Sequence, residues 1–500
     1  MPLKKQKKSP AICLPSVLAI GFTGHRSLKD EDQCREAIRS FLREQKEAHA
    51  GIVYGVSSAA AGGDQLFAES CLELGIPVRI LLPKPEEEFK KDFDGWSWQR
   101  TERIIEKALC VEVTGRNQGR SEQYYDCGIQ TVGESQVLVA LWDGAASRGV
   151  GGTQEIVAFA EKTGYPVAWI DAETTQLRWL NGEALKQTRS HPEQDFLNDL
   201  SDGGVTLASG TPRDLAEAWQ RKMDENANRS APQARRVASI PVVYTAAAAV
   251  LSGVAPEIPA AAPWLAVSAA LGLVALALPA VLRLHARQAK WARTRTAAEI
   301  SRSVLALWNT PGLFHALGSE AIAELSAMVR SLNFLKMQDR LREKRSLDSF
   351  RQEYVKDRVE DQIKYFTGQA KKAARQERIY GAVSWICGVL ATLVAAGCLT
   401  IEARWRGQRE IHGHEWIALT MSALFEISTM AGAFALMKDC GRRRRRYGEL
   451  SEWLKSSKTQ LENLRTWTSI LRIAERVERA LLVELLEWRS VVQGAATHRK

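Results

Sequence analysis

Four long apolar runs in the second half of this 500-residue chain restrict its fold most strongly. They cover residues 237–255, 264–282, 379–401 and 416–437. A helix needs about 20 apolar residues to cross the hydrocarbon core of a bilayer. The last two runs meet this length well, whereas the first is rich in alanine, contains Pro241 and equally suits a buried helix of a soluble domain. We therefore expect an all-α membrane domain with four transmembrane helices in two hairpins.

Charged residues beside the runs predict their orientation. The connection 256–263 contains no Lys or Arg, whereas five basic residues follow the second run between Arg283 and Arg295. Five consecutive arginines, Arg442 to Arg446, follow the fourth run. Because positively charged flanks stay in the cytoplasm, we expect a multi-pass protein of the inner (cytoplasmic) membrane with cytoplasmic N- and C-termini. Three arginines between the third and fourth runs weaken this assignment.

The charge divides unevenly along the chain, which bears on its partners. Residues 1–230 carry 28 Lys and Arg against 34 Asp and Glu, whereas residues 231–500 carry 40 against 24. A basic half suits nucleic acid or an anionic membrane face. The arginine block Arg442 to Arg446 adjoins an apolar run, and no nucleic-acid-binding motif accompanies it. We therefore expect the block to anchor in lipid headgroups, with a lipid bilayer and no nucleic acid as partner.

Residues 12–175 show a different pattern, in which apolar strand-like runs alternate with helical segments. The runs SVLAIGF, GIVYGVS, VRILLP, LCVEV, VLVALW and PVAWI have the length and composition of buried strands. Such alternation predicts an α/β domain, a Rossmann-like parallel sheet flanked by helices. Sheets of this kind bind ligands beyond the carboxyl ends of their strands, so we expect the loops after the strands to form one site.

Three of these loops combine glycine with polar residues. In the last of them a strand ends in Asp143-Gly144, and a glycine-rich segment, GVGGT, leads into a helix at Glu155. Glycine lets a phosphate approach the backbone, and the N–H groups and dipole of a helix N-terminus attract it. The predicted nucleotide-binding residues are Gly21, Thr23, Gly24, His25, Arg26, Ser57, Ser58, Gly62, Gly63, Asp64, Asp143, Gly144, Gly151, Gly152, Thr153 and Glu155.

Each loop also has a structural interpretation. The glycines are equally typical of turns, and His25 fits a capped or solvated loop histidine. Arg26 is more informative, because a guanidinium beside a strand end can make bidentate contacts with phosphate. Asp64 suits either a helix cap or a ribose hydroxyl. Thr153 and Glu155 suit either helix capping or ligand contact.

The segments GFTGHR, GVSSAAAGGDQLFAESCLELGIPVRILLPKPEEEFKKDF and ESQVLVALWDGAASRGVGGTQEIVAFA together resemble the SLOG superfamily. This Rossmann-like group includes the Lonely Guy phosphoribohydrolases and DprA-like proteins. The resemblance covers residues 12–175 and implies a pocket for a nucleotide-derived ligand, such as a cyclic nucleotide or an ADP-ribose derivative. It implies no other cofactor. Some members hydrolyse nucleotides, whereas others only sense them.

One difference from the hydrolase form of the motif bears on catalysis. That form resembles GGxGTxxE, whereas this chain has GVGGTQE, with one residue instead of two between Thr153 and Glu155. A shift of one position turns a side chain by about 100° around a helix axis. We therefore expect no catalytic residue, and sensing instead of hydrolysis. The alternative is a membrane-tethered nucleotide N-glycosidase or phosphoribohydrolase, with Glu155 and Arg26 as its working residues.

Each pair of apolar runs is followed by a basic helix with Leu and Trp spacing, KWARTRTAAEISRSVLALW and RRRRRYGELSEWLKSSKTQLENL. This layout resembles SLATT, a family of two-helix membrane effectors found fused to SLOG sensors in prokaryotic conflict systems. The resemblance implies a homo-oligomeric, pore-forming or membrane-disrupting effector that the sensor switches on. The function that we expect is nucleotide second-messenger sensing coupled to membrane damage in antiviral defence.

The expected domain boundaries follow from these patterns. A linker includes a transmitting helix over 212–227. The expected segments are a basic tail (1–11), the SLOG-like domain (12–175), the linker (176–234), a first SLATT-like hairpin with its cytosolic helix (235–312), a cytosolic helical segment (313–378) and a second SLATT-like hairpin with a C-terminal helix (379–500).

Glu426 is the one carboxylate inside the four apolar runs. An acid at that depth usually faces a bundle interior or a water path, so we expect Glu426 to line the conducting path. The alternative is a packing residue that is protonated or bonded to the adjacent Ser428 or Thr429. The eight cysteines show neither zinc-ligand nor paired-disulfide spacing, and we expect reduced thiols and no metal site.

Overall fold

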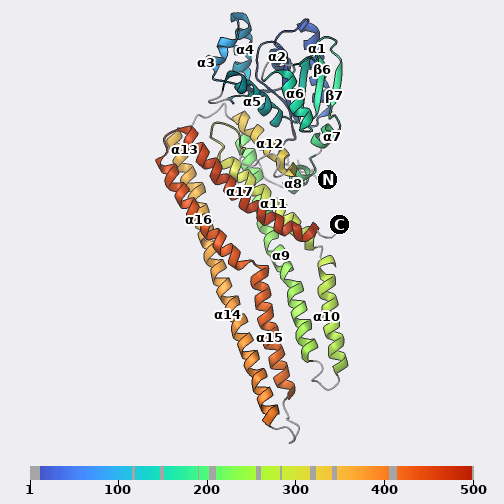
Figure 1. The fold of residues 1–500 in the computed structure, drawn as a ribbon, viewed down its shortest axis with the longest axis vertical. Coiled ribbons are helices and arrows are strands. Elements are labelled where there is room, and N and C mark those ends of the chain that lie inside the picture. Colours follow the sequence, from blue (N-terminus) through green and yellow to red (C-terminus); the bar gives the residue numbers. More distant parts are fainter. Residues whose placement is uncertain are drawn as a thin grey trace, which may run out of the picture. The chain divides into compact units, whose positions relative to one another are not determined.

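The structure, a computed structural model, describes residues 12–114, 119–146, 151–189, 191–201, 210–254, 261–281, 284–315, 323–339, 346–404 and 414–497. The chain divides into two compact units (Figure 1). The first comprises Met1–Arg221 and Ser301–Lys344, and the second comprises Lys222–Ile300 and Arg345–Lys500. The first unit is an α/β domain, whereas the second is helical.

A seven-stranded sheet forms the centre of the first unit, in the order β4-β3-β2-β1-β5-β6-β7. Strands β1 to β6 pair in parallel, and β7 pairs with β6 in the antiparallel direction. The strands are β1 Val17–Gly24, β2 Ile52–Ser57, β3 Val78–Leu82, β4 Cys110–Val113, β5 Val137–Trp142, β6 Val167–Asp171 and β7 Leu177–Leu180. The predicted α/β domain with a mainly parallel, Rossmann-like sheet is therefore confirmed.

Helices lie against the sheet because its central strands are apolar on both faces. In β1, Leu18 and Ile20 belong to one buried cluster, whereas Val17 and Ala19 belong to another. Strands buried on both faces read as continuous apolar runs, which is why the sequence pattern identified them. The helices of this unit are α1 Glu31–Ala48, α2 Gly63–Glu73, α3 Glu86–Phe89, η1 Lys90–Asp92, α4 Gly95–Lys107, α5 Arg120–Gly133, α6 Thr153–Lys162, α7 Ala184–Arg189, α8 Pro192–Ser201 and α12 Ala323–Asp339.

Helix α12 packs on the sheet although it is distant in sequence. The rings of Phe334 and Tyr54 lie 5.6 Å apart, and Met337 belongs to the same buried cluster. Lys336 is buried, and its Nζ donates a hydrogen bond to the Leu307 carbonyl at 2.7 Å. The segment 301–344 therefore completes the core of the first unit, a tertiary contact that the sequence pattern does not reveal.

The strand order reverses at β1, and the region beyond the carboxyl ends of β1 and β5, called the crevice below, is where such a sheet is expected to bind a ligand. Strands β2, β3 and β4 extend the sheet on one side of β1, and β5 and β6 extend it on the other. Gly24 at the end of β1 is in register with Leu141 near the end of β5. Open α/β sheets bind ligands beyond the carboxyl ends of the strands at such a switch point.

The second unit consists of long helices (Figure 1). Helices α9 and α11 each begin in one unit and end in the other without a break. The bounds are α9 Pro212–Val254, α10 Ala261–Val281, α11 Leu284–Ala306, α13 Leu347–Glu353, the π-helical segment η3 Tyr354–Val359, α14 Glu360–Arg404, α15 His414–Met437, α16 Cys440–Asn463 and α17 Trp467–Thr497.

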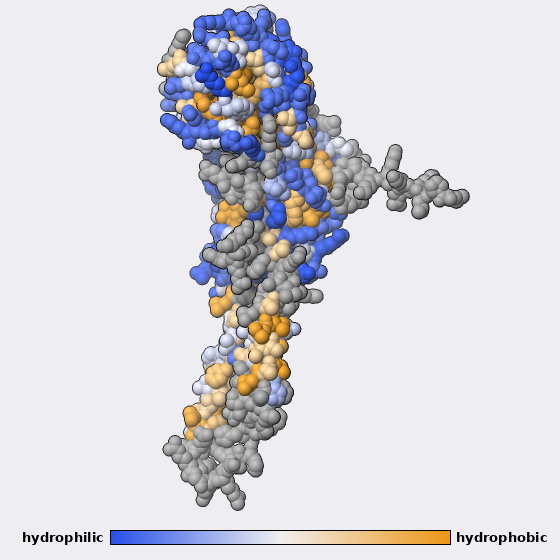
Figure 2. All heavy atoms as spheres, turned by 90° about the vertical axis from the view of Figure 1, so that its right-hand side faces the viewer, coloured by the Kyte–Doolittle hydropathy of each residue, from blue (hydrophilic) through white to orange (hydrophobic). Residues whose placement is uncertain are grey.

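Two helical stretches of the described chain are long and apolar enough to cross a membrane. They lie within Leu347–Thr400 and Thr420–Asn463, and a shorter apolar stretch, Leu265–Ala275, lies in α10. Figure 2 shows hydrophobic residues gathered over the long helices, in contrast to the mostly polar surface of the sheet domain. Trp385 and Leu436 are 70% and 83% exposed. Length and composition thus support the third and fourth predicted spans, and the first two predicted spans are not identified in this way.

Candidate functional site

His25 ties the loop after β1 to the loop after β5. Its backbone N–H donates to the Leu141 carbonyl at 3.1 Å. Its Nε2 lies 2.9 Å from Asp143 Oδ1 and 3.2 Å from the Asp143 backbone nitrogen. One ring nitrogen cannot donate to the carboxylate and accept from the N–H at once, and the shorter contact favours donation to Oδ1. The Ala145 N–H, assisted by His25, holds the pKa of Asp143 below its usual range.

The loop after β2 packs directly on the backbone that follows β1. The Gly63 N–H donates to the His25 carbonyl at 2.9 Å. Gly62 has a φ of +87°, and a Cβ there would lie 2.2 Å from the Arg26 carbonyl oxygen. A side chain at Gly62 would therefore separate the two loops, so backbone packing by itself accounts for this glycine.

Asp64 is a buried carboxyl that fixes the same loop. Its Oδ1 accepts hydrogen bonds from Ser58 Oγ at 2.7 Å, from Ser57 Oγ at 3.2 Å and from the Ser58 N–H at 3.2 Å. Burial raises its pKa to about 6, against the opposing effect of these hydrogen bonds and of Arg26. Gly62 is the N-cap residue of α2, and Asp64 lies in the first turn of this helix. Through its hydrogen bonds Asp64 fixes Ser57 and Ser58 at the end of β2.

Glu155 caps its own loop at the start of α6. Its Oε2 accepts a hydrogen bond from the Gly151 N–H at 2.7 Å, and its own N–H donates to the Gly152 carbonyl at 3.0 Å. Gly152 is the N-cap of α6 and provides no side-chain acceptor. Residues 147–150 of the glycine-rich segment lie outside the described residues. The carboxylate of Glu155 is thus engaged with backbone at this helix end.

The start of α6 lies against α5, which carries an aromatic residue of the crevice. Gly151 has a φ of +85°, and a Cβ there would lie 2.8 Å from the Tyr125 nitrogen and 3.1 Å from Tyr124 Cβ. The Arg26 guanidinium lies 4.9 Å from the centroid of the Tyr124 ring, within the range of a cation–π contact. Tyr124 therefore lies between the end of β1 and the glycine-rich loop.

Two further polar residues join Tyr124, and the sequence analysis missed them. The Tyr124 hydroxyl donates to Asp92 Oδ2 at 2.5 Å, and Lys84 Nζ lies 2.5 Å from the same oxygen. Burial, followed by the bond to Asp92, raises the pKa of Tyr124. Lys84 comes two residues after β3, so a basic residue behind a strand end was a usable signal. No local sequence pattern predicts that Tyr124 and Asp92 lie beside Lys84.

The remaining predicted residues differ in how they relate to the crevice. Gly21 lies within the central strand β1, and a Cβ there would be 2.6 Å from Ser135 Oγ, so its role is close packing against the end of α5 and the residues that follow it. Gly144 has a φ of +79° and turns the chain after β5. Thr23 and Gly24 end β1, and Thr153 begins α6.

The arrangement provides groups that can hold an anion. Arg26 is exposed at the switch point, and the α6 N-terminus lies beside Tyr124, with the Glu155 carboxylate bound to the Gly151 N–H just before it. Guanidinium groups and helix N-termini both favour phosphate. Over the described parts of the chain, no cluster of three His, Cys, Asp or Glu side chains could hold a metal ion.

Glu426 lies on the side of α15 that faces away from α14. The contact between the two helices runs through Ser428, whose Oγ donates to the Ser384 carbonyl at 2.7 Å. Two residues along a helix correspond to a rotation of about 200°, which puts Glu426 nearly opposite Ser428. Glu426 is half-buried, and among the described residues it has no hydrogen-bond or ion-pair partner.

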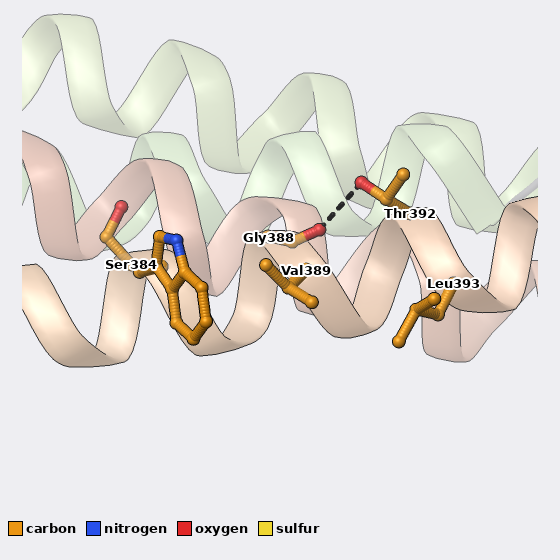
Figure 3. A pocket seen from close by; sticks show the side chains of 6 residues that line it. Ser384, Gly388, Val389, Thr392 and Leu393 are labelled. Atoms are coloured by element: carbon orange, nitrogen blue, oxygen red, sulfur yellow. Dashed lines mark hydrogen bonds between the residues drawn. The ribbon is translucent and has the colours of Figure 1, made fainter.

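An open hollow lies on α14 (Figure 3). Thr392 Oγ1 donates to the Gly388 carbonyl at 2.8 Å, and the lining carries no charged side chain. The lining residues are Ser384, Trp385, Gly388, Val389, Thr392 and Leu393. Such a surface suits hydrocarbon and offers little for recognition of a polar ligand.

Comparison with protein-family models gave no match, and comparison with curated proteins gave none either.

Proposed function

We propose that this protein senses a nucleotide-derived signal through its sheet domain and responds by forming a pore in, or disrupting, a membrane. The observation that carries the proposal is the meeting of three loops at the β1/β5 switch point. There Arg26 lies over Tyr124, and the Gly151 backbone adjoins the same tyrosine. The resemblance to SLOG sensors and SLATT effectors supports prokaryotic anti-phage or conflict defence, in which membrane damage stops infected cells, as the setting.

The ligand class follows from the chemistry of the crevice. Arg26 can bind a phosphate through two parallel N–H donors, and the first N–H groups of α6 can bind a second phosphate or the same one. The Tyr124 ring can stack on a base once the guanidinium turns toward the phosphate. We infer a nucleotide derivative of the cyclic-nucleotide or ADP-ribose kind as the ligand.

The contacts of Glu155 favour sensing over hydrolysis. A general base or nucleophile needs its carboxylate directed at the scissile bond. Glu155 Oε2 instead accepts from the Gly151 N–H at 2.7 Å, and this bond fixes the backbone just before α6. A Lonely Guy type of N-glycosidase activity is therefore the less supported alternative, and Glu155 is better explained as a loop-fixing residue.

Continuous helices offer a physical connection between the two units. Helix α9 contains the predicted transmitting segment 212–227 and runs on to Val254. Helix α11 runs from Leu284 in the second unit to Ala306 in the first. A ligand that moves a 1:99 resting equilibrium to 99:1 must bind the active state better by about 5.5 kcal/mol. Unbroken helices can transmit such a bias as a rigid-body movement.

Helix α5 links the crevice to segment 301–344, in which α11 ends. Tyr124 lies near its start, and Glu134 caps its end. Glu134 forms an ion pair with the buried Arg79, and His315 Nε2 lies 3.9 Å from the other Glu134 oxygen. A shift of α5 on ligand binding would therefore change the distance between Glu134 and His315.

For the membrane part, we propose four crossings with both termini in the cytoplasm and assembly into a homo-oligomer. Glu426 precedes Lys438 by twelve residues, a rise of about 18 Å, which is close to the middle of a hydrocarbon core about 30 Å thick. An acid at this depth without a partner in its own hairpin needs other protein or water beside it. We infer that copies of α15 surround a water path lined by Glu426.

Identification of a co-purified nucleotide tests the sensing half directly. The full chain is purified without added nucleotide and denatured, and the released small molecules are identified by mass spectrometry. We expect a phosphate-bearing nucleotide derivative from the wild type, little from Arg26→Ala, and a wild-type amount from Lys29→Ala. Lys29 is a matched control because it is an exposed cation near the same loop, paired with Glu173. Equal yields from Arg26→Ala and the wild type would contradict the assignment.

A further inference from the structure

The arginine block Arg442 to Arg446 occupies the start of α16, and carboxylates from α17 contact it. Arg446 forms ion pairs with both Glu484 and Glu487. Arg442 Nη2 lies 3.6 Å from Glu487 Oε2. The same cationic groups that the sequence assigns to lipid headgroups therefore hold the C-terminal half of α17 within the second unit.

The block lies where the apolar parts of two helices end. Lys438 Nζ contacts the Tyr380 hydroxyl and lies 4.9 Å from the centre of its ring, so the ends of both apolar stretches are level. Just beyond this level, Arg444 Nε lies 2.9 Å from Glu377 Oε2 of α14. The block follows Lys438 by four to eight residues, so it lies at most about 12 Å further along, beyond the turn at Asp439 that separates α15 from α16. With polar layers about 5 to 8 Å thick on each side of the hydrocarbon, these arginines reach lipid phosphates.

Helix α17 has two anchors of different character. In its first half, Glu478 is fully buried, and its carboxylate accepts from Arg358 Nη2 at 2.7 Å and from the Tyr354 hydroxyl at 2.8 Å. The second anchor joins the second half of α17 to α16. There Glu487 and Arg442 are 46% and 57% exposed, whereas Glu484 and Arg446 are 15% and 28% exposed. Exposed ion pairs are weak and screened by salt, whereas buried pairs are protected from competing ions. A competitor at the membrane surface would therefore act on the second anchor, and first on its exposed Arg442–Glu487 contact.

We propose that the phosphate headgroups of anionic phospholipids compete with Glu484 and Glu487 for Arg442 and Arg446, so that an anionic bilayer loosens the C-terminal half of α17. Phosphate accepts the paired N–H groups of a guanidinium as a carboxylate does. Near an anionic bilayer each arginine gains about fivefold in affinity (about 1 kcal/mol). The inference rests on the membrane placement of α14 and α15 in the proposed function, and it is independent of nucleotide sensing.

Hydrogen–deuterium exchange of the full chain in liposomes tests the inference. Liposomes of phosphatidylcholine alone are compared with liposomes that also contain phosphatidylglycerol. In the anionic liposomes we expect exchange over residues 481–492 to be about fivefold faster. Exchange over residues 469–478, beside the buried anchor, should be unchanged.

Two double variants separate the competition from general loosening. Glu484→Gln/Glu487→Gln removes the competing carboxylates, so exchange over 481–492 should be fast in both kinds of liposome, with several-fold more phosphatidylglycerol retained on purification. Glu452→Gln/Glu462→Gln removes the same charge from α16 carboxylates that contact lysines, and it should keep the lipid dependence of the wild type.

Several results would overturn the inference. One is identical exchange over 481–492 in neutral and anionic liposomes, and another is a response to phosphatidylglycerol that persists in Arg442→Gln/Arg446→Gln. Soluble phosphate or RNA that accelerates exchange in neutral liposomes as strongly as the anionic lipid does would exclude the lipid as the specific competitor. Failure of the chain to insert into any liposome would instead contradict the membrane placement in the proposed function, so the two failures are distinguishable.

Discussion

The carboxylates of Asp64 in the first unit and of Glu426 on α15 differ in their hydrogen bonding. Asp64 is buried in the sheet domain, and three hydrogen bonds from Ser57 and Ser58 satisfy its Oδ1. Glu426 on α15 is half-buried, and within the described chain nothing donates to it. A satisfied buried acid fixes the local fold, whereas an acid without a partner, in a helix that we propose to span a membrane, requires another group or water beside it. The first unit is therefore organised by its own contacts, and the hairpin depends on its surroundings.

The largest expected effect comes from breaking a buried ion pair. Glu478→Ala leaves the Arg358 guanidinium buried without its carboxylate, and such a change costs about 3 to 5 kcal/mol. Thermal unfolding of the detergent-solubilised chain should show the loss. Glu452→Ala, at an exposed carboxylate, serves as the control and should change stability by about 0.5 kcal/mol or less. A loss below 1 kcal/mol in Glu478→Ala would show that the buried pair does not secure α17.

Arg26 should dominate the affinity of the crevice. Its removal deletes charge-assisted hydrogen bonds worth about 2 kcal/mol, or roughly thirtyfold in affinity. Calorimetry with the nucleotide released from the wild-type chain measures the change. Tyr124→Phe keeps the ring and removes only the hydroxyl that contacts Asp92, so it should lose much less affinity. The reverse order of the two losses would place the ligand elsewhere.

Asp64 should make stability depend on pH. Because burial raises its pKa from 3.8 to about 6, the folded chain holds this proton more tightly than the unfolded chain does. The resulting stability is complete below the unfolded pKa and is lost as the pH rises through about 6. Relative to Asp64→Asn, the wild type should lose about 1.5 kcal/mol of unfolding free energy between pH 5 and 7.5.

Asp143 is the matched control for that pH dependence, because its pKa is shifted downward. Its contribution is present above the usual aspartate range and is lost as the pH falls, so the slope relative to Asp143→Asn should have the opposite sign. Denaturant titrations followed by tryptophan fluorescence at several pH values measure both slopes. Slopes of the same sign for the two aspartates would contradict the burial account of Asp64.

Glu426 should have the smallest effect on stability and a clear effect on transport. Glu426→Gln removes no contact within the hairpin, so the unfolding free energy should change by about 0.5 kcal/mol or less. If Glu426 lines a water path, the same change should lower cation selectivity in bilayer recordings. Unchanged conductance and selectivity would argue for a packing role.

The sequence predicted well what depends on local pattern. The strands could be predicted because residues such as Ile20 and Val139 belong to continuous apolar runs. The position of the candidate site at the carboxyl ends of the strands could be predicted because Arg26 follows the end of β1. Tyr124 and Asp92 were not predicted, because their contact joins a helix to a distant short helical turn. Contacts of this kind depend on the tertiary structure and leave no periodic pattern in the sequence.

The same limit applies to the helices. The pattern 313–378 suggested a cytosolic segment, yet nothing local indicates that Phe334 packs on Tyr54 of the sheet. The arginine block suggested lipid contact, whereas its ion pairs with Glu484 and Glu487 required α17 to fold back along α16. Charge and hydropathy along a chain predict whether a segment suits lipid, water or a protein core. Tertiary packing decides which other segment it contacts.

Dye efflux from liposomes tests the coupling of sensor to membrane most directly. The full chain is reconstituted into dye-loaded liposomes, and the nucleotide identified from the purified protein is then added. We predict rapid efflux with the wild type, efflux with Lys29→Ala, and little efflux with Arg26→Ala. Efflux that is the same with and without the nucleotide, or the same in Arg26→Ala and the wild type, would contradict the account.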